Sequence, residues 1–176
     1  MPPLYVALLA LVGAERVREL TISRRNSRSV PGEASASRSY PLIVAAHIGL
    51  FTLPVVEIAL TRPKPRARNL WLALLAAATG LRWWSISSLG SAWNVQAQVP
   101  RDLSPVTAGP YRYLRHPNYL ALIVEFVALP MAGGAWRSAI GLSLLHGLAP
   151  FDRIRSREAL PHGSAAYGAP SPAKRR

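Results

Sequence analysis

The stretch best suited to chemistry runs Gly-Pro-Tyr-Arg-Tyr-Leu-Arg-His-Pro-Asn-Tyr over residues 109–119, here called the signature segment. Its arginines, histidine and tyrosines suit a ligand that carries both a carboxylate and an aromatic base. Pro110 and Pro117 lack an N–H and disfavour helix at the residue before them, so the segment predicts a shaped loop. Pro117 is suited to open a helix as its first residue, which places His116 at a helix N-terminus that favours negative charge.

The same segment has a second interpretation, as a loop at a membrane surface. Its tyrosines would then belong to an aromatic belt, and its arginines would face lipid headgroups. Apolar stretches flank it on both sides. Composition and spacing leave both interpretations open.

Five apolar segments must position the signature segment. Half of the 176 residues are hydrophobic and only 16% are charged, against about 25% charged in ordinary soluble domains. A helix that crosses a bilayer needs about 20 apolar residues, and two shorter segments joined by Ala-Gly-Gly predict an antiparallel helical hairpin. The apolar segments cover residues 4–14, 40–60, 69–89, 118–131 and 135–151. The first is expected to continue as a helix to residue 20, and it either crosses the bilayer or lies partly in the interface. We therefore expect an all-α fold, a polytopic integral membrane helical bundle with about five transmembrane segments.

Some charged residues interrupt these segments. The charges of residues 15–19 are expected at the headgroup level, Glu57 is expected to reach the interface, and Arg82, beside two tryptophans, is expected to act as an interfacial anchor. Glu125 is embedded in an apolar segment, where an ionisable residue is a functional hypothesis by default. Its alternative role is that of a structural partner for Arg82 or for a tyrosine hydroxyl.

The charge of the chain is strongly basic, with 21 Lys+Arg against 8 Asp+Glu and a net charge of +13. The basic residues lie in short clusters between apolar segments, which favours a lipid bilayer over nucleic acid as the partner. If all five segments cross, the positive-inside rule puts the signature segment and the C-terminus on the cytoplasmic side and the N-terminus outside, although the basic turn at 61–69 is discordant. The membrane is expected to be a bacterial inner membrane. Cysteine is absent, and no paired histidines predict a metal site.

The pattern Gly-Pro-Tyr-x-x-x-Arg-His-Pro-x-Tyr resembles the signature of the isoprenylcysteine carboxyl methyltransferase family and of the wider group of membrane methyltransferases. The resemblance extends roughly from Glu15 to Leu160 and ends in Arg-x-Arg-x-x-Glu at residues 153–158. It implies S-adenosylmethionine as the cofactor, in a cytosol-facing pocket made from the His-Pro-x-Tyr segment and the last helix. The cofactor-binding residues that it implies are Tyr111, Tyr113, Arg115, His116, Pro117, Asn118, Tyr119 and Glu158.

The resemblance also implies a lipophilic methyl acceptor. Arg153 or Arg155 would pair with a substrate carboxylate, as in a prenylated cysteine. A carboxylate is already ionised and needs no base, whereas a lipid phenol or pyrone would need one, for which Glu125 is the candidate. Catalysis would rest mainly on aligning the acceptor with the methyl group.

One departure from the family pattern leaves other interpretations open. Arg157 stands where the family usually has the first of two adjacent acids, so a non-catalytic family member is an alternative. A sterol-reductase-like membrane oxidoreductase is another, although the sequence contains no Gly-x-Gly-x-x-Gly. Residues 1–160 are expected to form one methyltransferase-like domain, and 161–176 a disordered basic tail.

Overall fold

A computed structural model describes residues 2–29, 40–93 and 107–158 of the chain. These residues form five α-helices and two short 3-10 turns, without a strand. The expected all-α fold is thereby confirmed, while the predicted tail at 161–176 lies outside the described residues. The helices are α1 (Pro3–Ser29), α2 (Tyr40–Thr61), α3 (Arg68–Leu89), α4 (Pro117–Ala132) and α5 (Trp136–Glu158), and the turns are η1 (Gly90–Ala92) and η2 (Gly109–Arg112).

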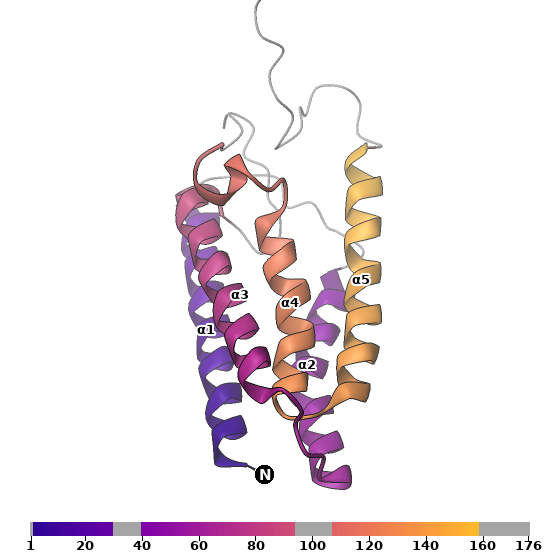
Figure 1. Cartoon of the computed structure of the whole chain (residues 1–176). Coiled ribbons are helices and arrows are strands. Elements are labelled where there is room, and N and C mark those ends of the chain that lie inside the picture. The colour runs from indigo at the N-terminus through magenta and orange to yellow at the C-terminus, as the bar shows by residue number, and fades with distance from the viewer. Residues whose placement is uncertain (1, 30–39, 94–106, 159–176) are drawn as a thin grey trace, which may run out of the picture.

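Consecutive helices run in opposite directions along the bundle (Figure 1). The N-terminus and the turn between α4 and α5 lie at one end. The end of α3, η2, the start of α4 and the end of α5 lie at the other, which we call the signature end. The predicted hairpin of the last two helices is confirmed, and it returns the chain to the end from which α4 starts.

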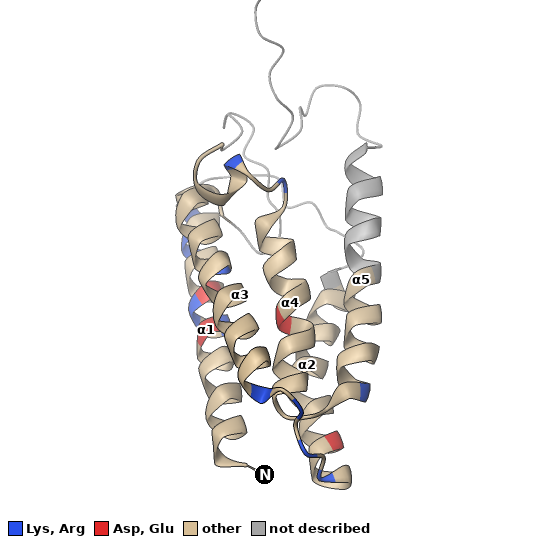
Figure 2. Cartoon of the chain, viewed as in Figure 1, with Lys and Arg blue, Asp and Glu red and all other residues tan. Residues whose placement is uncertain are grey.

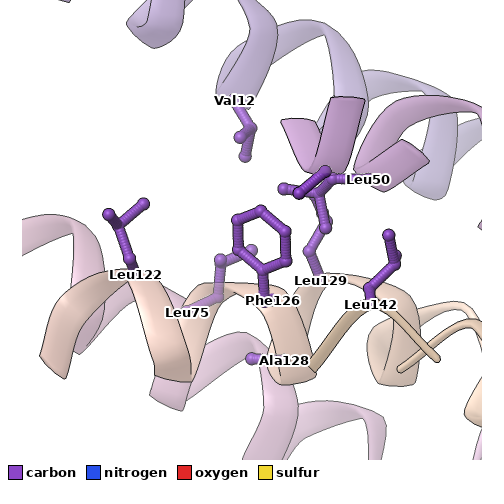
Figure 3. Close-up of a cluster of buried hydrophobic side chains, with 9 residues drawn as sticks. Val12, Leu50, Leu75, Leu122, Phe126, Ala128, Leu129 and Leu142 are labelled. Carbon is purple, nitrogen blue, oxygen red and sulfur yellow. The ribbon is translucent and has the colours of Figure 1, made fainter. Parts of the chain in front are cut away.

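A single hydrophobic cluster joins all five helices. Phe126 of α4 is fully buried at its centre, with Val12 of α1, Leu50 of α2, Leu75 of α3 and Leu142 of α5 around it (Figure 3). Such close packing against one aromatic side chain leaves little freedom for any helix to shift on its own. The core therefore fixes α4, and with it the signature segment, relative to the rest of the bundle.

Membrane-spanning character is clearest in α2. Its residues Pro41–Thr61 are long and apolar enough to cross a membrane by length and composition. The helix α4 is also apolar but has only 16 residues. The fully polytopic arrangement stays a prediction.

The tight turn between α4 and α5 depends on two adjacent glycines. Gly134 has a φ of 84°, in the left-handed region that glycine adopts without steric cost. A Cβ on Gly133 would lie 2.5 Å from Ile58 Cδ1 and 2.7 Å from Tyr5 Cε2. The turn can therefore pack directly against α1 and α2.

Glu57 caps the start of α5, a role that the sequence did not indicate. Its carboxylate accepts hydrogen bonds from the backbone N–H groups of Arg137 (3.2 Å) and Ser138 (2.7 Å), and from the Ser138 hydroxyl (2.6 Å). The first N–H groups of a helix have no partner within the helix, and a negative charge there is also favoured by the helix dipole. Glu57 thus ties α2 to the beginning of the last helix.

We expect Glu57→Ala to lower the free energy of unfolding by about 0.5–2 kcal/mol, the range for loss of a helix cap. Thermal unfolding of detergent-purified protein measures the change. Glu57→Gln keeps an acceptor oxygen and should lose less. Equal stability of Glu57→Ala and the parent protein would contradict the capping role.

Candidate functional site

The signature segment forms the shaped loop that its prolines predict. It begins with the 3-10 turn η2 and leads through an irregular stretch to α4, in which Pro117 is the first helical residue. The carbonyl of His116, the residue before the helix, accepts hydrogen bonds from the N–H groups of Tyr119 (3.1 Å) and Leu120 (3.2 Å). His116 therefore sits at the N-terminus of α4, as expected.

The side chains of this loop divide into an exposed group and an anchored group. Arg115 and His116 are exposed, as is Tyr113, with 73% of its surface accessible. The His116 ring packs edge-on against Tyr119, with 5.6 Å between ring centroids. The anchored group comprises the buried Pro117 and the half-buried Tyr111, Asn118 and Tyr119. Cationic and aromatic groups are thus presented together at the signature end.

Gly109 fixes η2 against the end of α3. Its φ of 61° lies in the left-handed region. A Cβ at this position would lie 2.0 Å from the Ser88 Oγ atom and 3.1 Å from Trp84 Nε1. Only glycine meets both requirements without a shift of the backbone, so the first residue of the signature segment is explained by packing.

Behind the loop, Arg82 of α3 makes a buried, two-pronged ion pair with Glu19 of α1. Its Nε and Nη2 atoms donate to the two carboxylate oxygens of Glu19, the latter at 2.6 Å. Its Nη1 donates to Asn118 Oδ1 at 3.2 Å. The expectation that Arg82 is an interfacial anchor was wrong, because its charge is matched inside the bundle by an acid 63 positions earlier.

Arg16 extends this pairing to α4. Its Nη1 donates to Glu19 Oε2 at 2.7 Å and its Nη2 donates to Glu125 Oε2 at 2.6 Å. The expected headgroup position of the α1 charges was therefore wrong for Arg16 and Glu19, which pair inside the bundle. Figure 2 shows acidic and basic positions part-way along α1, away from the ends of the helix. We call Arg16, Glu19, Arg82, Glu125 and Asn118 the ionic network; its two cations and two carboxylates balance in charge.

The ionic network shows which residue Glu125 pairs with. Glu125 is buried and bonded to Arg16, rather than to Arg82 or a tyrosine. Its Oε1 and the Nε of Arg16 are buried without a protein hydrogen-bond partner. Its role as a base for an acidic hydroxyl stays a prediction, and a structural role in the network is directly visible.

Next to the network, two further residues of α1 contact Trp83. The Trp83 Nε1–H donates to Glu15 Oε1 at 3.3 Å, and the Arg18 guanidinium lies 4.5 Å from the ring centroid. These contacts lie nearer the surface, since Arg18 is exposed. Removing the Glu15–Trp83 contact therefore serves as a control when the stability contributed by the buried ion pairs is measured.

The remaining predicted site residues, Arg153, Arg155 and Glu158, lie on the last turns of α5. They belong to the helix backbone, which ends at the signature end (Figure 1). Their side chains lie outside the described part of the chain. The fold therefore brings the two predicted halves of the site to one end of the bundle.

Sequence reasoning missed Glu19 and Arg82 as residues connected with this site. The available signal was the spacing of Arg16 and Glu19, three residues apart on one helix face at the end of an apolar segment. Arg82 within an apolar segment was a second signal, because an intramembrane charge usually has a partner.

Comparison with known proteins covers the same elements. The model of the isoprenylcysteine carboxyl methyltransferase (ICMT) family matches residues 71–160, which include most of α3, the signature segment, α4 and α5. A Bacillus subtilis (strain 168) protein named "Uncharacterized protein YpbQ" is 27% identical over 161 residues, covering 88% of this chain and 95% of that protein. No solved structure matches the chain. Because the family match spans both halves of the predicted site and half of the sequence, the chain belongs to the isoprenylcysteine carboxyl methyltransferase family, a family of membrane methyltransferases.

Proposed function

We propose that the protein is a membrane-embedded methyltransferase that uses S-adenosylmethionine and acts on a lipophilic substrate. One observation carries the proposal: the signature segment opens α4 at the end of the bundle where α5 brings residues 153–158. The family match covers both of these elements. It also favours a methyltransferase over the reductase alternative.

The residues at this end fit the cofactor chemically. Arg115 and His116 are exposed cationic or polar groups beside a helix N-terminus, a setting that suits a carboxylate. The exposed Tyr113 and the half-buried Tyr111 offer aromatic faces for an adenine. Glu158 would accept from the ribose hydroxyls or the ammonium group. When bound, the cofactor supplies an electrophilic methyl group on a sulfonium.

The protein's own contribution is alignment. Arg153 or Arg155 would hold the carboxylate of the acceptor by a charge-assisted contact, and the helices around it would exclude water. A carboxylate acceptor requires no proton transfer. Glu125 lies about 12 Å of helix rise from Pro117, at about 1.5 Å per residue, and is bonded to Arg16. A phenol or pyrone would need Glu125 as a base at the signature end, whereas a carboxylate needs no base. The position of Glu125 and its bond to Arg16 therefore support a carboxylate acceptor over a phenol or pyrone.

A bilayer setting is supported by the outer faces of the bundle. Large apolar side chains are exposed on every helix, among them Leu11 at 61%, Leu60 at 79% and Leu144 at 68% accessibility. Apolar surface of this extent is rare on soluble monomers and is typical of a lipid contact. We therefore propose that α2 is joined by the other helices in the bacterial inner membrane, with the signature end in the cytoplasm.

The test is binding of S-adenosylmethionine, measured by calorimetry on detergent-purified protein. The parent protein should bind saturably, and His116→Ala and Glu158→Ala should each weaken binding by about tenfold, or about 1.4 kcal/mol. Both variants remove a proposed ligand contact. Arg137→Ala, an exposed residue at the opposite end of the bundle, is the control and should bind like the parent.

Absence of binding by folded parent protein would refute the proposed activity. The chain would then be a non-catalytic family member, the alternative that Arg157 raises. Binding that neither His116→Ala nor Glu158→Ala weakens would leave the activity standing and refute the assignment of the site. Methyl transfer to a prenylated cysteine, compared with a lipid phenol, then identifies the acceptor class.

A further inference from the structure

Among the described residues, the ionic network contacts the signature segment at Asn118. Arg82 donates to the side-chain oxygen of Asn118 at 3.2 Å, while two other nitrogens of the same guanidinium are held by Glu19. Arg82 and Glu19 are both buried, and Asn118 is half-buried at the second position of α4. A fixed, buried cation therefore stands directly behind the helix N-terminus.

This contact determines which way the Asn118 amide faces. A guanidinium has donors only, so the group that approaches it must be the amide oxygen. The two branches of an amide diverge, and the NH₂ group is accordingly turned away from Arg82. The donors of Asn118 thus become available to an acceptor outside the network, at the start of α4.

We propose that Glu19 and Arg82 are positioning residues, which act through Asn118 to present its NH₂ group to an acceptor of the bound cofactor. The acceptor class is a carboxylate, a hydroxyl oxygen or a ring nitrogen. The inference rests on the proposed function. It extends the site to α1, which lies before the matched residues 71–160.

The fork geometry of Arg82 is central to this role. Two nitrogens hold Glu19 and a third holds Asn118, so the planar guanidinium transmits the position of α1 to α4. A lysine would keep the charge next to Glu19 but has no rigid fork. Arg82→Lys is therefore a mild change that loosens the amide of Asn118.

The first experiment is Asn118→Asp, with binding of S-adenosylmethionine and thermal unfolding measured on the same full-length protein in detergent. Aspartate keeps an oxygen for Arg82 and suits the first turn of a helix, so the unfolding temperature should be retained. It removes the NH₂ donors, so the dissociation constant should rise by about tenfold or more. Parent-like affinity in Asn118→Asp would overturn the inference. This variant tests the inference even if Arg82→Lys fails to fold.

The second experiment is a double-mutant cycle with Arg82→Lys and Asn118→Ala. If Arg82 acts through Asn118, Arg82→Lys should weaken binding at least fivefold in the parent background and less than twofold in Asn118→Ala. Independent sites would instead give additive effects. Glu57→Ala is the control for general loss of stability, because it perturbs the opposite end of the bundle and should leave affinity unchanged.

The outcomes separate the two proposals. Saturable binding with a non-additive cycle supports both. Binding with additive effects overturns the positioning role and leaves the methyltransferase standing. No binding by the folded parent protein overturns the proposed function, and the inference falls with it.

Discussion

Glu19→Ala should lower the free energy of unfolding by about 3–5 kcal/mol, the cost of breaking a buried ion pair by removing one partner. The variant leaves the buried guanidinium of Arg82 and the part-buried guanidinium of Arg16 with Glu125 as the carboxylate that remains in the network. An unmatched buried cation loses its hydration without compensation. Thermal and denaturant unfolding in detergent would measure the loss.

Two further variants distinguish loss of the buried ion pair from a general loss of stability in α1. Glu15→Ala, one turn away on α1, removes a single hydrogen bond from Trp83 and should cost only about 0.5–1.5 kcal/mol. The double variant Glu19→Ala/Arg82→Met removes both charges of the pair and should be more stable than Glu19→Ala alone, because no unpaired guanidinium remains at α3. A double variant less stable than the single one would contradict the network's energetics.

Gly109→Ala should disrupt the signature segment itself. A left-handed conformation costs a residue with a Cβ about 1–2 kcal/mol, and the new methyl group would also meet Ser88 Oγ at 2.0 Å and Ser88 Cβ at 2.9 Å. Overpacking of this kind typically costs a further ~1–3 kcal/mol. We expect a lower unfolding temperature together with a loss of S-adenosylmethionine affinity of about tenfold or more, since η2 must move away from α3.

The matched control is Gly80→Ala, in the same helix against which η2 packs. Gly80 is exposed, and nothing lies within 4 Å of its added Cβ. Alanine in a helix interior is favoured over glycine by about 0.5–1 kcal/mol, so this variant should be slightly more stable and should bind normally. Normal binding and stability in Gly109→Ala would show that the loop does not need the observed backbone conformation.

Local patterns were enough to predict that the described residues hold five helices, and to place both ends of the second and third. The first and last helices run on to Ser29 and Glu158, past the segments predicted to end at residues 20 and 151, because they continue through charged residues. The segment predicted at 40–60 is the helix Tyr40–Thr61, and the segment at 69–89 is Arg68–Leu89. Apolar runs bounded by Pro-rich or Gly-rich turns carry this information within a few residues. Pro117 likewise marked the start of α4, because its ring fits the first position of a helix.

Contacts between distant residues could not be predicted in the same way. Glu19 and Arg82 are 63 positions apart, and Glu57 caps a helix 81 positions later. Each of these charges alone has a plausible place at an interface, so the sequence does not distinguish an anchor from a buried pair. The cofactor contacts proposed for residues 109–119 and for Glu158 remain predictions that the binding experiments decide.

The alternation of charge in the ionic network restricts the register in which α1 can pack against α3 and α4. Apolar side chains specify little between helices that are surrounded by lipid, because lipid tails are equally apolar. Arg16 and Glu19 present opposite charges about 4.5 Å apart along α1, at about 1.5 Å per residue, and each meets an opposite charge on α3 or α4. Sliding α1 by that distance would bring Arg16 opposite Arg82, so we expect the first helix to have one permitted register in the assembled bundle.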